Sequence, residues 1–227
     1  RRNVKFHDCS PFTADDVVFS YQRIKQPQGT MQPYVTGVKE VRKIDEHTVD
    51  FFLEGANPVF LRNLVIFHIM SKPWAEKTKS QNVQNYKDRE ETYASRNVNG
   101  TGAYMIKLWE PDKRIVFAAN PGWWDKREGN VTEVVYTPIK SDSTRVAALL
   151  AGDVDMVTDL PTQDLARLRQ DPKLKVLDGA ENRTIFIALD QGSTELKYAD
   201  VKGKNPFKDL RVRRALNMAV DREAIKR

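Results

Sequence analysis

The sequence of 227 residues has one cysteine, Cys9, and three histidines. A single cysteine excludes an intrachain disulfide, which suits a reducing compartment and equally a periplasm, where many proteins have none. The longest apolar tract, residues 64–70, is interrupted by His68 and is far shorter than the about 18 residues that cross a bilayer. No segment of the sequence is therefore expected to span a membrane.

Common motifs of metal binding and catalysis are also missing. The sequence has no CxxC or HExxH spacing and no GxSxG turn. His7 and Cys9 lie two residues apart, as side chains on one strand face do, which is more typical of half-buried strand residues than of a metal site. Asp153 and Asp155 show the same spacing, and such a pair either does acid–base chemistry or simply ends a strand. We expect no metal site, no cofactor and no catalytic set.

The composition is that of a globular protein, with 40% hydrophobic and 30% charged residues. The net charge of +6 arises from 37 basic and 31 acidic residues that alternate along the chain. The densest basic patch, without regularly interleaved aromatic residues, is Lys202, Lys204, Lys208, Arg211, Arg213 and Arg214. Nucleic acid or an anionic surface is a possible partner for such a patch, but the mixed charges favour no nucleic-acid partner.

The ends of the chain suggest a piece of a longer protein. The first residues enter strand-like sequence with no initiator methionine and no apolar leader, and the last residues stop within a helical pattern. We therefore expect a chain truncated at both ends.

Hydrophobic periodicity predicts the order of secondary structure. Helices are expected at residues 13–25, 57–65, 142–151, 163–169 and from 210 onward, the third ending at Gly152. Hairpins are expected at residues 38–44 with 48–53 and 103–109 with 114–119, and further strands at 133–137, 154–157, 174–177 and 184–189. Residues 76–99 are polar and predict a crossing or a surface excursion. The alternation of strands and helices in the second half predicts parallel pairing, hence an α/β class with mixed sheets.

Five segments, in order along the chain, resemble the peptide/nickel class (family 5) of bacterial extracellular solute-binding proteins of ABC transporters. Residues 4–20 (VKFHDCSPFTADDVVFS) resemble its signature region, with Cys9 where a glycine is usual. Residues 99–104 (NGTGAY) resemble its crossing segment, with Ala103 in place of a proline. Residues 120–124 (NPGWW), 147–155 (AALLAGDVD) and 206–223 (PFKDLRVRRALNMAVDRE) resemble its turn, helix–strand unit and final helix.

The resemblance implies a periplasmic-binding-protein-like, two-lobe α/β architecture with mixed sheets and an extra domain, truncated at both ends. Residues 1–74 then correspond to most of the extra domain, residues 75–180 to the bulk of the first lobe, and residues 181–227 to the start of the second lobe. If the family turn at Cys9 needs a positive φ, Cys9 is expected in a strained conformation.

Matching positions imply a ligand site and a hinge. The implied ligand contacts are Tyr34, Thr158, Asp159, Leu160, Arg183, Thr184, Ile185 and Phe186. The implied hinge is Gly100, Thr101 and Gly102, where two glycines allow backbone freedom but are too few for a phosphate-binding loop. For each of these residues, a loop or strand position without ligand contact remains the alternative.

The resemblance implies the non-catalytic, extracytoplasmic solute-binding component of an ABC importer. It is expected to capture a peptide-like ligand by hinge closure and to deliver it to the permease subunits. A nickel chelate, a sugar or an opine is the alternative ligand, and a hydrolase using Asp153, Asp155 or Asp159 is the alternative class. The implied location is the periplasm, or the cell exterior as a membrane-anchored lipoprotein in a Gram-positive source.

Overall fold

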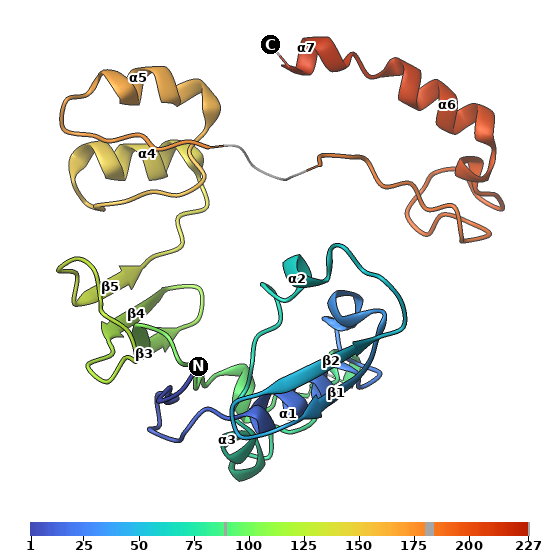
Figure 1. Ribbon diagram of the computed structural model, residues 1–227. Helices are drawn as coiled ribbons and strands as arrows, with labels where there is room; N and C mark the ends of the chain where they lie inside the picture. The colour runs from blue at the N-terminus through green and yellow to red at the C-terminus, as the bar shows by residue number, and fades with distance from the viewer. Residues whose placement is uncertain (89, 180–183, 227) are drawn as a thin grey trace. The chain divides into compact units, whose positions relative to one another are not determined.

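The structure is a computed structural model that describes residues 1–88, 90–179 and 184–226. The chain forms two compact units, Arg1–Leu160 and Pro161–Arg227. Figure 1 traces the elements of both units along the chain.

Helix α1 (Ala14–Ile24) begins after Thr13, as predicted. Thr13 and Asp16 form a capping box, in which the Thr13 backbone N–H donates to the Asp16 carboxylate at 2.8 Å. Val17 and Tyr21 lie one turn apart and are both buried, so this face of the helix enters the core.

The core of the first unit lies between α1 and a hairpin. Strands β1 (Val38–Lys43) and β2 (Val49–Leu53) pair antiparallel, and α1 packs against them (Figure 1). The Tyr21 hydroxyl donates to the Val38 carbonyl at 2.8 Å, which satisfies both buried groups. The buried core residues are Val17, Tyr21, Val35, Val38, Val41 and Phe60. The first predicted hairpin is thus confirmed.

Two short helices follow, α2 (Phe60–Asn63) and α3 (Lys72–Lys77). Helix α2 is shorter than predicted, because the Asn57 side chain accepts from the Val59 N–H and forms a turn before it. The Lys72 N–H at the start of α3 donates to the Asp16 carboxylate at 2.7 Å. One buried carboxylate therefore joins the first turns of α1 and α3.

A second sheet contains β3 (Tyr104–Glu110), β4 (Arg114–Ala119) and β5 (Glu133–Tyr136), in the antiparallel order β3-β4-β5. It follows the predicted polar stretch, which carries the 3₁₀ turns η2 (Tyr86–Asp88) and η3 (Tyr93–Ser95). Helix α4 (Asp142–Ala151) comes next and ends at Gly152, as predicted.

The second unit consists of short helices and long connections. Its elements are η4 (Thr162–Asp164), α5 (Leu165–Gln170), η5 (Pro206–Lys208), α6 (Leu210–Ala219) and α7 (Arg222–Lys226). Leu168 is fully buried. Asn205 is also buried, and its Nδ2 donates to the Asp190 and Ser193 carbonyls at 2.9 Å.

The prediction of parallel pairing in the second half is wrong for the described residues. Residues 154–157, 174–177 and 184–189 form no strand there, and the strand pairs that do form are antiparallel. A strand needs a neighbour to take up its backbone hydrogen bonds, and no described strand is paired with these segments. Apolar residues at helical spacing in the last predicted helix are also exposed, with Leu216 of α6 at 43% and Val220, just after α6, at 40%.

Candidate ligand-binding site

The loop after α4 carries the predicted contacts Thr158, Asp159 and Leu160. Gly152, with φ of 80°, ends α4 in the left-handed region, and the next N–H returns to the helix at Ala148. Thr158 and Asp159 are exposed and Leu160 is half-buried. Asp159 has φ of 54°, a conformation that aspartate tolerates better than most residues.

Arg145 holds this loop in place, a role that the sequence analysis missed. Its Nη2 donates to the Asp159 carbonyl at 2.8 Å and to the Asp142 carboxylate at 2.7 Å. Its Nη1 donates to the Ile139 carbonyl at 2.8 Å. The available signal was the pair of opposite charges three residues apart on α4. Arg145 thus fixes the backbone that presents Thr158 and Asp159.

Tyr34 lies in the 3₁₀ turn η1 (Gln32–Val35), between α1 and β1. Val35 anchors this turn in the core, whereas Tyr34 is only half-buried. Within the described ranges, the Tyr34 hydroxyl has no hydrogen-bond partner, so it is free to bind another molecule.

The predicted contacts Thr184, Ile185 and Phe186 belong to the second unit, and Arg183 lies outside the described residues. Thr184 is exposed. Ile185, Phe186 and the next residue, Ile187, are 91%, 75% and 80% exposed. No described residue forms a hydrogen bond with the backbone of these three residues. Such a run of unpaired N–H and C=O groups is a template for pairing with another extended chain.

The structure describes the predicted contacts in two groups, one in each unit. In the described part of the first unit, no hydrogen bond, ion pair or ring contact joins Tyr34 to residues 158–160. The prediction that these residues share one ligand therefore stays a prediction.

The predicted hinge, residues 100–102, is held by side chains from the turn after β4. The Trp124 indole N–H donates to the Thr101 carbonyl at 2.9 Å, and the Asn120 Nδ2 donates to the Gly102 carbonyl at 3.1 Å. Trp124 belongs to the segment NPGWW, residues 120–124, that resembles the family's turn. Its indole N–H in addition ties the turn to the crossing segment.

A close approach, and not backbone handedness, favours glycine at position 100 of this segment. Gly100 and Gly102 both have φ outside the left-handed region. A Cβ on Gly100 would lie 3.3 Å from Cε1 of His7, which is a tight contact. The space above Gly100 is thus filled by the imidazole ring of His7.

Cys9 adopts the positive φ that was predicted, 67°, and is an exposed free thiol. Its N–H donates to the Phe6 carbonyl at 2.9 Å, within a tight turn closed by a bridge between Lys5 and Pro11. His7 lies in the same turn. The placement of His7 and Cys9 on one strand face is therefore wrong, because both residues lie in the turn that reverses the chain between Lys5 and Pro11.

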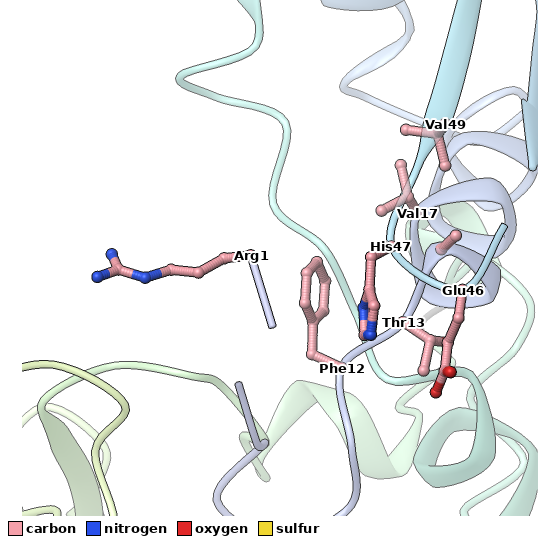
Figure 2. Close-up of a pocket in the computed structure, with 8 residues that line it drawn as sticks. Arg1, Phe12, Thr13, Val17, Glu46, His47 and Val49 are labelled. Carbon is pink, nitrogen blue, oxygen red and sulfur yellow. The ribbon is translucent and has the colours of Figure 1, made fainter. Parts of the chain in front are cut away.

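Figure 2 shows a small cavity where the start of α1 meets the turn before β2. Phe12 and His47 lie side by side at it, whereas the Arg1 side chain points away (Figure 2). Its volume is about 40 Å³, close to that of one water molecule. Ligand pockets usually measure about 300 Å³ or more, so this cavity is no site for a peptide.

A larger hollow of about 290 Å³ lies beside the turn after β4. The Asp125 carboxylate in it is paired with Arg1 at 3.4 Å, and the Arg1 guanidinium lies 4.0 Å from the Trp124 ring centroid. The walls of this hollow come from one stretch of chain, residues 119–127. It therefore offers one face to a ligand and does not enclose it.

The three carboxylates of the alternative hydrolase, Asp153, Asp155 and Asp159, are all exposed. Among the residues that the structure describes, no group of three His, Cys, Asp or Glu side chains is placed to hold a metal ion. The same residues include no helix that is long and apolar enough to cross a bilayer.

Comparisons with known proteins connect this geometry to a family. The model for "Bacterial extracellular solute-binding proteins, family 5 Middle" matches residues 1–227. The chain is 29% identical to the periplasmic oligopeptide-binding protein OppA of Salmonella typhimurium and 32% identical to heme-binding protein A of Haemophilus influenzae. Each alignment covers 99% of this chain and 42% of the relative, so the chain spans less than half the length of these proteins.

A solved structure supports the same fold. The periplasmic binding protein DppA from Helicobacter pylori, in complex with the peptide STSA, is 25% identical, with a TM-score of 0.63. The match covers 76% of this chain and 36% of that chain. The predicted α/β, periplasmic-binding-protein-like class is thereby confirmed, and the family points to a binding protein rather than an enzyme. Since the family model matches from the first residue to the last, the chain belongs to family 5 of the bacterial extracellular solute-binding proteins.

Proposed function

We propose that the protein containing this chain captures a peptide between two lobes by hinge closure and delivers it to the permease of an ABC importer. The observation that carries the proposal is the exposed stretch Ile185, Phe186 and Ile187, whose backbone groups have no partner among the described residues. Every peptide offers the same N–H and C=O groups, so pairing along this stretch binds peptides of many sequences.

Two further residues fit a peptide ligand. The exposed carboxylate of Asp159 suits the α-ammonium group of a peptide, and Arg145 fixes its backbone at 2.8 Å. The free hydroxyl of Tyr34 suits a peptide carbonyl. In this proposal residues 1–74 belong to the extra domain, residues 75–180 to the first lobe and residues 181–227 to the second, and the hinge is at residues 100–102.

The names of the relatives support both a peptide and other ligands. OppA and DppA are named for peptides, whereas another relative is named for haem. We place the protein outside the cytoplasm, as the names of its periplasmic relatives suggest. Haem and a nickel chelate therefore belong in the same ligand screen as the peptides.

The test is a thermal-shift screen of the full-length protein with peptides of two to six residues, haem and nickel–histidine. A ligand that binds only the native state raises Tm by mass action, by an amount that grows with its concentration. We expect a shift with peptides. A shift with haem or nickel–histidine alone would replace the peptide in the proposal, and turnover of a peptide lost on replacing Asp153, Asp155 or Asp159 would favour the hydrolase.

Proline substitutions test backbone pairing directly. Proline removes one N–H, and in a strand the N–H groups of alternate residues point to the same side. Ile185→Pro and Ile187→Pro should therefore act alike, and Phe186→Pro should act differently. We expect either the two isoleucine variants or Phe186→Pro to weaken peptide affinity by about tenfold or more. A tenfold change corresponds to about 1.4 kcal/mol of binding free energy. Equal, small effects at all three positions would reject recognition through this stretch.

A further inference from the structure

The ring of His7 bridges the two glycines of the crossing segment. The Gly100 N–H donates to Nδ1 at 3.3 Å, and Nε2 lies 3.2 Å from the Gly102 carbonyl oxygen. A carbonyl only accepts and an amide N–H only donates, so Nε2 must carry the proton and Nδ1 must be bare. Both bonds thus exist together only in the neutral Nε2–H tautomer.

The backbone around His7 strengthens this bridge. The His7 N–H donates to the Gly100 carbonyl at 2.8 Å, and the Asp8 N–H donates to Asn99 Oδ1 at 3.1 Å. A Cβ at Gly100 would make a tight contact with the ring, 3.3 Å from its Cε1. The loop that carries His7 is therefore docked on residues 99–102, with the imidazole at the centre of the contact.

We infer that His7 is a positioning residue that fixes the crossing segment only while its imidazole is neutral. Protonation places an N–H on Nδ1, opposite the Gly100 N–H, so that two donors meet and their hydrogen bond is lost. Histidine is the side chain that changes charge between pH 5 and 8. Acidification through this range should loosen residues 99–102 from the His7 loop. The consequence for ligand capture rests on the proposed hinge at this segment, whereas the bridge itself does not.

Few charged groups compete for the imidazole. Beside it in the loop, the Asp8 carboxylate accepts from the Ser10 hydroxyl at 2.6 Å and from the Ser10 N–H at 3.0 Å. The other titratable side chains of the loop, Lys5 and Cys9, are exposed. Residues 99–103 of the crossing, and Trp124 and Asn120 behind it, carry no titratable side chain. The change of charge on His7 is therefore the event that alters this contact.

The test is hydrogen exchange of the Gly100 amide in the full-length protein without ligand, at pH 5.5 and 7.5, corrected for intrinsic exchange. The wild type should lose protection at pH 5.5 by about threefold to tenfold, the factor expected for one hydrogen bond. His7→Gln keeps an amide donor and does not titrate, so the corrected exchange rate of its Gly100 amide should show no step, that is, no difference between the two pH values. His47→Gln and His68→Gln, at the other two histidines, should keep the wild-type step.

Two results overturn the inference. One is equal corrected exchange of the wild-type Gly100 amide at both pH values, and the other is a step that persists in His7→Gln. If His7→Gln does not fold, His7→Asn replaces it, because asparagine keeps an acceptor near the Nδ1 position. Its corrected Gly100 exchange should likewise be equal at the two pH values. The exchange experiment contains no ligand, so its outcome does not depend on whether the thermal-shift screen finds peptide binding. Dissociation of a bound peptide at the two pH values then shows whether the loosened segment is the hinge.

Discussion

The hairpin region of the first unit and the second unit have similar hydrophobic patterns and opposite burial. Helix α1 has apolar residues at helical spacing and buries Val17 and Tyr21 against β1 and β2. Helix α6 has the same spacing, yet its Leu216, and Val220 just after it, are about two-fifths exposed. A hydrophobic face tells which side of a helix can be buried, and only a packing partner buries it.

This contrast divides the described chain by the source of its stability. In the hairpin region a contiguous core of six buried residues lies under α1, and burial of such side chains contributes about 1.5–3 kcal/mol each. In the described part of the second unit, Leu168 and Asn205 are the buried residues. Substitutions of the same kind should therefore have different effects in the two regions.

The largest expected difference is between two phenylalanines. Phe60 is 9% exposed and packs on Phe51 with ring centroids 5.4 Å apart, whereas Phe186 is 75% exposed. Phe60→Ala should reduce the free energy of unfolding by about 3 kcal/mol, because it leaves a cavity in the core. Phe186→Ala should change it by less than about 0.5 kcal/mol. Urea unfolding of both variants measures the difference, and equal losses would contradict the contrast between the regions.

A smaller effect is expected at two neighbouring aspartates. The buried Asp16 carboxylate accepts from the N–H groups of Thr13 and Lys72, and Asp16→Ala leaves both donors without a partner. We expect a loss of about 2 kcal/mol in unfolding free energy. The matched control is Asp15→Ala, since Asp15 makes an exposed ion pair with Lys43 at 2.6 Å that is worth at most about 1 kcal/mol. A larger effect at Asp15 would show that the capping network is unimportant.

The elements that the sequence predicted well are those whose bonds are local. Helix α1, both hairpins and α4 follow from caps, turns and alternation within a few residues. The positive φ of Cys9 came from the resemblance, since a glycine is usual at this position. The strands predicted at residues 154–157, 174–177 and 184–189 failed because a strand depends on a neighbour that its own residues do not specify.

The resemblance proposes positions for the site but does not reach the contacts that hold them. Family matching named Asp159 and the Gly100 to Gly102 segment. It missed Arg145 and His7, which hold the backbone of these two places. His7 lies 93 residues from Gly100 in sequence, and no local pattern joins such distant positions. The ion pair of Arg145 could be predicted from the sequence, because its partner Asp142 is three residues away on the same helix.

A modest gain in stability is expected from Cys9→Gly. Cys9 has φ of 67°, which costs a residue with a Cβ about 1 kcal/mol and costs glycine nothing. Part of this gain is offset by the greater freedom of glycine in the unfolded chain, so we expect an increase of about 0.5 kcal/mol. Cys9→Ala separates the thiol from the backbone, because alanine keeps the strain and should leave stability unchanged. A loss of stability in Cys9→Gly, measured by urea unfolding, would contradict the strain.

The smallest effect should be at Asp209, a half-buried residue that caps α6 in the second unit. Hydrogen bonds from the Arg211 side chain and backbone lower the pKa of the Asp209 carboxyl from 3.8 to about 2. A lowered pKa in the folded state stabilises the protein above about pH 4, and this contribution disappears as the pH falls toward 2. Carboxyl-carbon NMR should show the Asp209 pKa rising in Arg211→Gln and unchanged in Arg214→Gln. Because the ion pair lies at the surface and is screened by solvent, Arg211→Gln should lower the free energy of unfolding at neutral pH only slightly, and Arg214→Gln should leave it unchanged. A loss of unfolding free energy in Arg211→Gln as large as that in Phe60→Ala would mean that ion pairs stabilise the second unit as strongly as the core stabilises the first.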